Sequence, residues 1–185
     1  MGKLEFATPA IYHANEFVLA ALDRVQDRFL DALGISAETA LIEFRLAPLR
    51  TRRDIAMLGL LQRIVLGKAP EQFNSIVIPA SRPTFPRSFR DPMRRHSRQL
   101  HDPACGAEKR ILQRSWLKLI YTYNVLPQTV VDSVAVNTFQ KQLQNAVIRG
   151  ARADARNWSR MFSLGVRSMT VATFQALFED AEAAA

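Results

Sequence analysis

Hydrophobic residues recur every three or four positions through most of the first half of the chain, and this spacing predicts amphipathic helices. The first helix is expected over 15–34, where Gly34 is a natural stop. Charged residues, mainly aspartates with Arg24 and Arg28, fill its other side. Its apolar stripe consists of Val18, Leu22, Val25, Phe29 and Leu33.

Two further helices are predicted in this half. Ser36 can cap a short helix over 37–47, which Pro48 ends. A third helix over 51–67 is nearly apolar around its middle, so we expect it at the centre of the core. Its apolar stripe consists of Ile55, Leu58, Leu61 and Val65. Residues 70–78 leave room for a helical turn or two.

The second half of the chain repeats the helical spacing. A helix over 107–124 must stop before Pro127, because a proline disfavours helical backbone at the residue before it. Its apolar stripe consists of Ile111, Leu112, Trp116, Leu119, Ile120 and Tyr123. Trp116 and Trp158 both lie on apolar stripes, which predicts positions in the core rather than platforms for a ligand.

Two more helices complete the pattern. Asp132 or Ser133 can cap a helix over 134–150, with Gly150 just past its end. Its apolar stripe consists of Val136, Phe139, Leu143 and Val147. A more polar segment then leads to a final helix over 170–185, which we expect to fray.

These patterns predict an all-α fold of about seven helices in two lobes joined by a Pro/Arg-rich loop. The predicted organisation is an N-terminal helical lobe over 1–78, a basic loop over 79–106, a C-terminal helical lobe over 107–165 and a terminal helix over 166–185. Evidence for strands is thin, since the apolar runs at 76–78 and 130–131 are too short to argue for a sheet.

Composition narrows the class of protein. The chain has 185 residues, of which 48% are hydrophobic, enough to build a core. The single cysteine, Cys105, cannot form an internal disulfide and fits a reducing compartment. There is no signal-peptide core at the N-terminus and no apolar run of membrane-spanning length. We therefore expect an intracellular protein, cytoplasmic or nuclear, without a membrane partner.

The net charge of +8 is concentrated in one part of the chain. Residues 1–81 carry nine Lys/Arg and nine Asp/Glu and sum to zero. Residues 82–114 carry nine Lys/Arg against three Asp/Glu, which gives +6. Residues 115–185 carry seven against five and add +2. Such a local excess can act as a positive field for an anionic partner.

The segment 82–103 holds six arginines and four prolines, and two interpretations compete for it. It is either a solvated connector, which the prolines keep irregular, or an arm that follows the phosphate backbone of RNA or DNA. The phosphate-contact candidates are Arg82, Arg87, Arg90, Arg94, Arg95 and Arg98. Phe85 and Phe89 offer faces for stacking on bases. Composition alone does not decide between the two.

Motifs for catalysis, metals or cofactors are missing from the sequence. His96, His101, Asp102 and Cys105 lie close together, but a structural zinc site normally needs four ligands with at least two cysteines. The glycines are isolated, so there is no Gly-rich phosphate loop, and neither G-x-S-x-G nor H-E-x-x-H occurs. We therefore name no catalytic residue, no metal ligand and no cofactor.

Three motifs, in the same order along the chain, resemble the region that follows the polymerase core in LINE-type (non-LTR) retrotransposon reverse transcriptases. The string LAPLRTRRDIAMLGLLQRIVLGKAPEQF, over 46–73, is similar to that family's leucine-proline-leucine turn, Arg-Arg-Asp helix start and glycine-terminated apolar helix. The matching residues are Leu49, Arg52, Arg53, Asp54 and Gly67. LDRVQDRFLDALG upstream and YNVLPQTVVDSVAVNTFQKQLQ downstream complete a resemblance over about 10–163, with Tyr123 where tryptophan is commoner.

This resemblance implies a tail region without its own polymerase active site. No Asp-Asp pair occurs in the chain, so the two-metal chemistry of that family cannot be built from it. We expect a nucleic-acid-binding helical segment that contacts backbones, with a polymerase domain encoded upstream as a further partner. The alternatives are a helical protein-interaction module, whose apolar stripes dock onto a partner, and a fragment of a retroelement that has no function.

Overall fold

The computed structural model describes residues 8–80, 96–103 and 115–179. Within these ranges the chain folds into nine α-helices with short 3-10 and π-helical turns, which confirms the predicted all-α class. The described residues contain no strand, and their one β-type pairing is an isolated antiparallel bridge between Pro79 and Leu100.

Three helices of the first half lie where they were predicted, although the second of them ends at Phe44, with Arg45 as a left-handed cap, before Pro48. The helical elements of this half are α2 (Thr8–Ile11), α3 (Glu16–Leu33), α4 (Ala37–Phe44), α5 (Leu49–Val65) and the 3-10 helix η1 (Glu71–Ser75). The short helix α2 was not predicted.

Asn15 caps α3 by accepting the Phe17 N–H, and Gly34 ends it in the left-handed conformation at φ 65°. Ser36 caps α4 as predicted, with its Oγ 3.0 Å from the Thr39 nitrogen. The end of α3 at Gly34 and the start of α4 at Ser36 could be predicted because each depends on a single residue and its close neighbours.

The second half contains the predicted helices together with short helical segments that were not predicted. The helical elements of this half are η2 (Trp116–Lys118), α7 (Leu119–Asn124), α8 (Gln128–Val131), α9 (Val136–Arg152), η3 (Trp158–Arg160), the π-helix η4 (Met161–Gly165), α10 (Val166–Ser168) and α11 (Val171–Ala176). α9 begins after Ala135 without a side-chain cap. It also runs through Gly150 to Arg152 instead of ending there, and a Cβ at this glycine would collide with the end of the Met161 side chain. The glycine therefore serves a close approach inside the helix.

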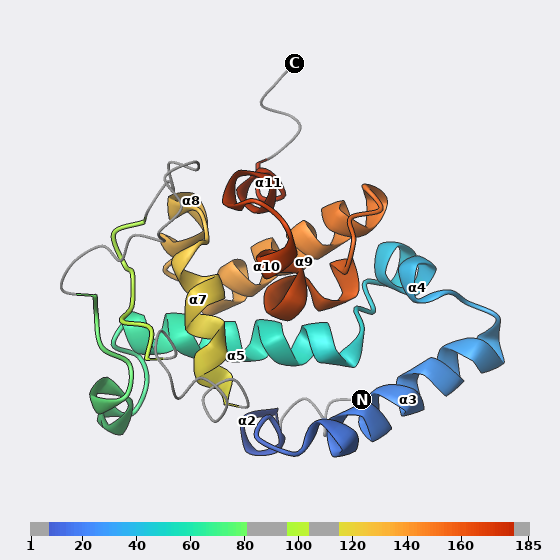
Figure 1. Cartoon of the computed structure of the whole chain (residues 1–185), viewed down its shortest axis with the longest axis horizontal. Coiled ribbons are helices and arrows are strands. Elements are labelled where there is room, and N and C mark those ends of the chain that lie inside the picture. Colours follow the sequence, from blue (N-terminus) through green and yellow to red (C-terminus); the bar gives the residue numbers. More distant parts are fainter. Residues whose placement is uncertain (1–7, 81–95, 104–114, 180–185) are drawn as a thin grey trace.

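α5 is the central helix, as its apolar middle predicted (Figure 1). It packs chiefly against α9, and also against α7 and α3. Buried side chains from both halves of the sequence form one hydrophobic cluster, whose fully buried members include Leu41, Leu58, Leu61, Leu119, Ile120, Tyr123, Phe139 and Leu143. The predicted N-terminal and C-terminal lobes thus share a single core.

The Tyr123 and Gln62 side chains are hydrogen-bonded inside this core. The Tyr123 hydroxyl donates to Oε1 of Gln62 at 2.7 Å, and the Gln62 amide donates to the carbonyls of Val131 and Ser133. Gln62 on α5 therefore connects α7 to the chain that enters α9. Such satisfied contacts avoid the cost of burying a polar group alone.

Candidate interaction surface

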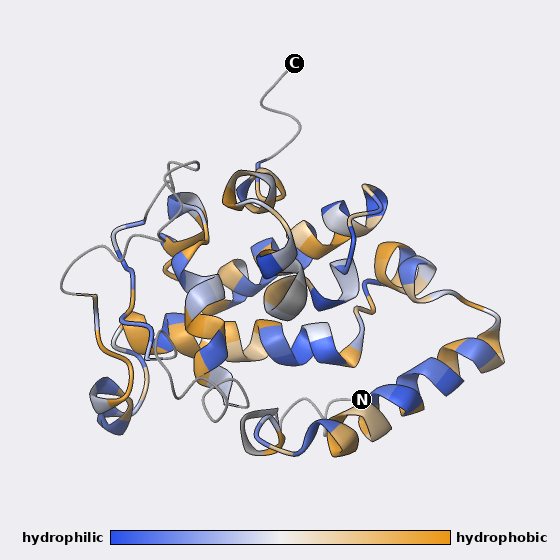
Figure 2. Cartoon of the chain, in the orientation of Figure 1, coloured by the Kyte–Doolittle hydropathy of each residue, from blue (hydrophilic) through white to orange (hydrophobic). Residues whose placement is uncertain are grey.

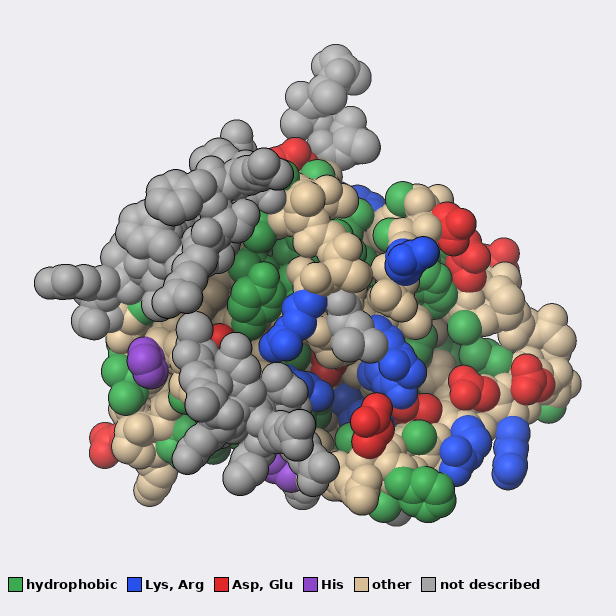
Figure 3. Space-filling view, viewed as in Figure 1, with side chains coloured by type: hydrophobic (Ala, Val, Ile, Leu, Met, Phe, Trp, Pro, Cys, Tyr) green, Lys and Arg blue, Asp and Glu red, His purple; other side chains and the backbone are tan. Residues whose placement is uncertain are grey.

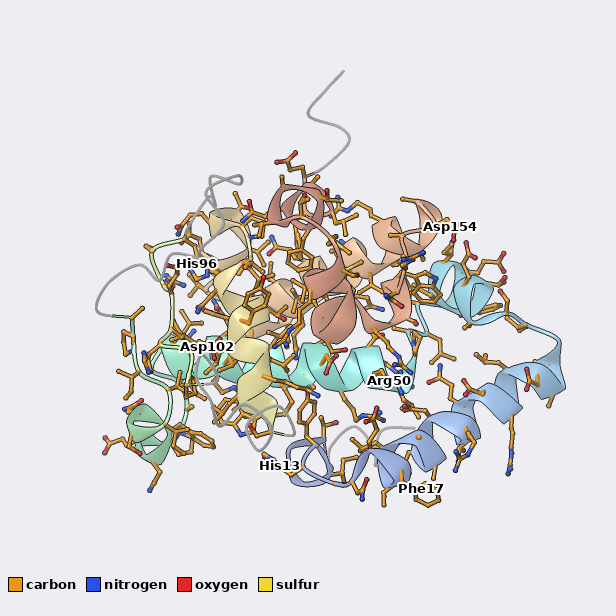
Figure 4. All side chains as sticks on the ribbon, viewed as in Figure 1. His13, Phe17, Arg50, His96, Asp102 and Asp154 are labelled. Carbon is orange, nitrogen blue, oxygen red and sulfur yellow. The ribbon has the colours of Figure 1, made fainter. Side chains whose placement is uncertain are left out.

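α3 is attached to the rest of the molecule mainly by polar side chains. Asp23 accepts from Nη2 of Arg53 at 2.7 Å and from Nη2 of Arg50 at 3.3 Å. Gln26 is buried and donates to the Ala47 carbonyl, while its Oε1 accepts from Arg52 at 3.3 Å. Figure 4 shows Arg50 between the end of α5 and α3.

The apolar stripe of α3 lies beside this polar contact and faces solvent. Val18, Val25, Phe29 and Leu33 are 49%, 59%, 49% and 54% exposed, and Leu22 is half-buried. Phe17 adds a further ring that is 74% exposed and points away from the body of the molecule (Figure 4). We call the set Val18, Val25, Phe29 and Leu33 the α3 face.

A stripe of this kind ordinarily faces the core, and here it does not. The buried residues of α3 are Gln26 and Leu30, which lie roughly one helical turn apart on a neighbouring side of the helix. Figures 1 and 2 show α3 along the outer edge of the molecule, with hydrophobic positions alternating with hydrophilic ones along it. Figure 3 shows hydrophobic side chains over this edge among acidic and basic ones. The solvent-facing side of α3 is therefore apolar, whereas the solvent-facing side of most helices is polar.

The predicted phosphate-binding residues are only partly covered by the structure. Arg82, Arg87, Arg90, Arg94 and Arg95, with Phe85 and Phe89, lie outside the described residues. Arg98 is described, and its Nη1 donates to the Val131 carbonyl at 2.6 Å. Its guanidinium is thus engaged at the end of α8, next to the protein body.

The end of the predicted basic loop, residues 96–103, packs into the fold. The Asn124 side chain accepts from the Leu100 N–H and donates to the Leu100 carbonyl, both at 2.8 Å. Leu100 itself is buried. The Ala80 N–H donates to the Gln99 carbonyl, and the His101 N–H donates to the Ile78 carbonyl. This part of the loop is therefore neither a free arm nor a solvated connector.

His96 anchors the start of that segment. Its Nε2 lies 2.9 Å from the Tyr123 carbonyl, and its Nδ1 accepts the Arg98 N–H. This pair of contacts requires a neutral ring with the proton on Nε2. Burial lowers the pKa of His96, and the Arg98 charge lowers it further, against the Tyr123 carbonyl and Asp132, which raise it. Among the described residues, no three His, Cys, Asp or Glu side chains gather as they would around a metal ion.

A second buried polar pair joins Tyr12, which directly follows α2, to α5. The Tyr12 hydroxyl donates to Oδ1 of Asp54 at 2.7 Å. Burial raises the pKa of Asp54, opposed by the Tyr12 hydrogen bond and by the charges of Lys118 and Arg53. Burial also raises the pKa of Tyr12. The Lys118 ammonium lies 5.1 Å from the centre of the Tyr12 ring. Tyr12 therefore makes a cation–π contact in addition to its hydrogen bond.

No protein-family model, no curated protein and no solved structure matches the chain. The described helices include none that is both long enough and apolar enough to span a membrane.

Proposed function

We propose that the chain is a helical interaction module that associates through the α3 face, with a second copy of itself as the occupant. The observation that carries the proposal is the exposure of Val25 and Phe29 at the middle of an apolar stripe. The stripe lies on a helix whose attachment to its own fold is mainly polar, with Leu30 as its one buried apolar residue. In a monomer this arrangement leaves apolar surface in water without compensation.

The size of the α3 face favours association. Four side chains exposed by about half offer on the order of 400 Å² of apolar surface, the scale at which patches mark interaction sites. Pairing two such faces, together with their polar rims, buries roughly 1,000 Å² in total, near the lower bound for a specific interface. We therefore expect a weak dimer.

The shape and charge of α3 favour a second copy. A straight stripe that recurs every three or four residues is self-complementary about a two-fold axis, so one helix can pack on its own symmetry mate. Asp27 and Asp31 project from the opposite side of the helix, so pairing does not bury them. α3 carries four acidic residues and two arginines, a balance that does not suit an anionic membrane surface.

Light scattering across a dilution series tests this proposal. The wild-type chain should form a dimer at high concentration, and Val25→Asp or Phe29→Asp should each give a monomer with an unchanged circular dichroism spectrum. Val134→Asp is the matched control, because Val134 is 67% exposed but lies outside α3, and it should leave the dimer intact. A wild-type monomer at every concentration would overturn self-association. If that monomer bound a polymerase domain supplied in trans and Val25→Asp abolished the binding, the α3 face would belong to that partner.

A second candidate function is binding to a nucleic-acid backbone. The observation that favours it is charge: the described residues 115–179 carry seven Lys/Arg against three Asp/Glu, and the basic segment precedes them. Replacing Arg82, Arg87, Arg90, Arg94, Arg95 and Arg98 by glutamine tests it. If they contact phosphates, affinity for an oligonucleotide falls roughly a thousandfold between about 50 and 200 mM salt, and the replacement removes that dependence. A flat salt response in the wild type would exclude the candidate.

A further inference from the structure

Residues 96–100, which we call the docked segment, lie against α7 and α8 (Figure 1). Three backbone carbonyls in the last turns of these helices accept hydrogen bonds from its side chains. The last carbonyls of a helix have no partner within the helix, and basic side chains often supply one. The pairs are His96 Nε2 with the Tyr123 carbonyl at 2.9 Å, Gln99 Nε2 with the Asn124 carbonyl at 3.2 Å and Arg98 Nη1 with the Val131 carbonyl at 2.6 Å.

Two carboxamides of the helices hold the backbone of the docked segment. The Asn124 side chain accepts the Leu100 N–H and donates to the Leu100 carbonyl, both at 2.8 Å. Oε1 of Gln128 accepts the Ser97 N–H at 2.8 Å, and its Nε2 donates to the Ser97 hydroxyl at 3.2 Å. Backbone N–H and C=O groups occur in every peptide, so most of these contacts do not depend on the side chains of the segment.

Two positions of the docked segment do depend on the type of side chain. Leu100 is 2% exposed and belongs to the hydrophobic cluster of the core, so its position requires an apolar side chain. The Arg98 guanidinium donates to a carbonyl, so its position requires a hydrogen-bond donor. The helices therefore fit a peptide in which a leucine follows two residues after a basic residue.

The docked segment also has the properties of a ligand. Nδ1 of His96 accepts the Arg98 N–H at 3.1 Å, so a contact within the segment stabilises its own turn. A turn that is formed beforehand loses less entropy on binding. Ser97 is exposed, so solvent reaches this site. On its other side the segment accepts the Ala80 N–H at the Gln99 carbonyl, again through backbone alone.

We propose that the ends of α7 and α8 form a peptide-binding site, which the docked segment occupies as an internal ligand. The site consists of Asn124, Gln128 and the carbonyls of Tyr123 and Val131. Its partner is a segment of another protein that carries a basic side chain two residues before a leucine. A tethered ligand competes at an effective concentration on the order of 1 mM, so the partner binds only when the docked segment leaves. The α3 face takes no part in this site.

Fluorescence anisotropy with the labelled peptide HSRQLHDP, residues 96–103, tests the proposal on the full chain. Leu100→Ser removes the apolar anchor of the internal ligand and leaves the site unchanged. This variant should bind the peptide at least tenfold more tightly than the wild type, whose site is occupied. A peptide in which serine replaces the leucine is the matched control and should bind neither chain. Equal affinity of the two chains for the peptide, or of Leu100→Ser for the two peptides, would overturn the proposal.

A second variant keeps the test independent of the fold of Leu100→Ser. Circular dichroism checks that variant, because Leu100 is buried. The Arg98 side chain is only partly buried, and Arg98→Ala removes its bond to the Val131 carbonyl. Arg98→Ala should bind the peptide about fivefold more tightly than the wild type, as expected for the loss of one competing hydrogen bond. Equal affinity in Arg98→Ala and the wild type would refute the proposal even if Leu100→Ser does not fold.

Variants of the helices locate the site. In the Leu100→Ser chain, Gln128→Ala removes both contacts to Ser97 and should weaken peptide binding about tenfold. Gln72→Ala is the matched control, because Gln72 is an exposed glutamine outside the site, and it should leave the affinity unchanged. Equal losses in the two variants would place the peptide elsewhere. The dimer expected from the α3 face should persist in Arg98→Ala, so either proposal can fail alone.

Discussion

α3 and α5 are helices of similar length with apolar residues at helical spacing, yet the fold uses them in opposite ways. α5 spans 17 residues and buries eleven of them, from Leu49 to Ile64. α3 spans 18 residues and buries two, Gln26 and Leu30. The stripe of α5 is covered by α7 and α9, whereas that of α3 is open to solvent.

The difference shows what helical periodicity measures. An apolar stripe indicates that one side of a helix is suited to burial, but not which element covers it. On α5 the cover comes from the same chain. On α3 the same-chain contact consists of polar side chains and the buried Leu30, and it lies to one side of the stripe. This displacement is the basis of the proposed association.

The largest contrast should appear in core truncations. Leu58 is fully buried on α5, so Leu58→Ala should lower the free energy of unfolding by about 2–5 kcal/mol. Val25 is 59% exposed on α3, so Val25→Ala in a dilute, monomeric sample should change it by less than about 0.5 kcal/mol. Urea denaturation measures both. Similar losses in the two variants would show that α3 is packed like α5.

A smaller effect should come from the polar attachment of α3. Asp23→Asn leaves the nearly buried Arg53 without its carboxylate and should cost about 2–3 kcal/mol. Asp27→Asn is the matched control, because Asp27 is an exposed aspartate on the same helix, and it should be almost neutral. Equal effects in the two variants would mean that the Asp23 contact does not hold α3.

Asp54 gives α5 a pH dependence of its own. Because burial raises its pKa above the ordinary value, the folded state keeps the Asp54 proton to higher pH than the unfolded state does. Stability should therefore fall as the pH rises from about 4 through the folded pKa. Asp54→Asn removes this decline, so the stability of the variant relative to wild type should rise with pH. Denaturant midpoints between pH 4 and 7 measure it, and parallel profiles would contradict it.

The lowered pKa of His96 predicts that stability depends on pH with the opposite sign. Its pKa is lowered in the fold, so the unfolded state takes up the proton first as the pH falls below about 6.5. Stability should be full above that pH and decline as the pH falls toward the folded pKa. Residues 96–103 should lose amide protection first, because a protonated Nδ1 cannot accept the Arg98 N–H. His96→Gln should abolish this acid step, and an acid step that persists in the variant would assign it to another group.

Local signals carried most of the correct predictions of the fold. The stripes containing Leu58, Leu119 and Phe139 identified the core, and the caps at Ser36 and Gly34 were readable from single residues. These features depend on neighbours within a few positions along the chain, which is the information that a sequence pattern contains.

The rest depends on contacts between distant segments. Met161 packs against Gly150 inside α9, and Asn124 holds Leu100 through two hydrogen bonds. The local sequence of neither segment indicates which distant residue it contacts.

Amide hydrogen exchange of α3 and α5 at low and high protein concentration tests the central claim most directly. α3 makes few contacts within one chain, and association through the α3 face would add more. Deuterium uptake over α3 should therefore fall as the protein concentration rises. Uptake over α5 should stay the same, because its contacts lie within one chain. Identical uptake over α3 at both concentrations would contradict the claim that a second copy covers this face.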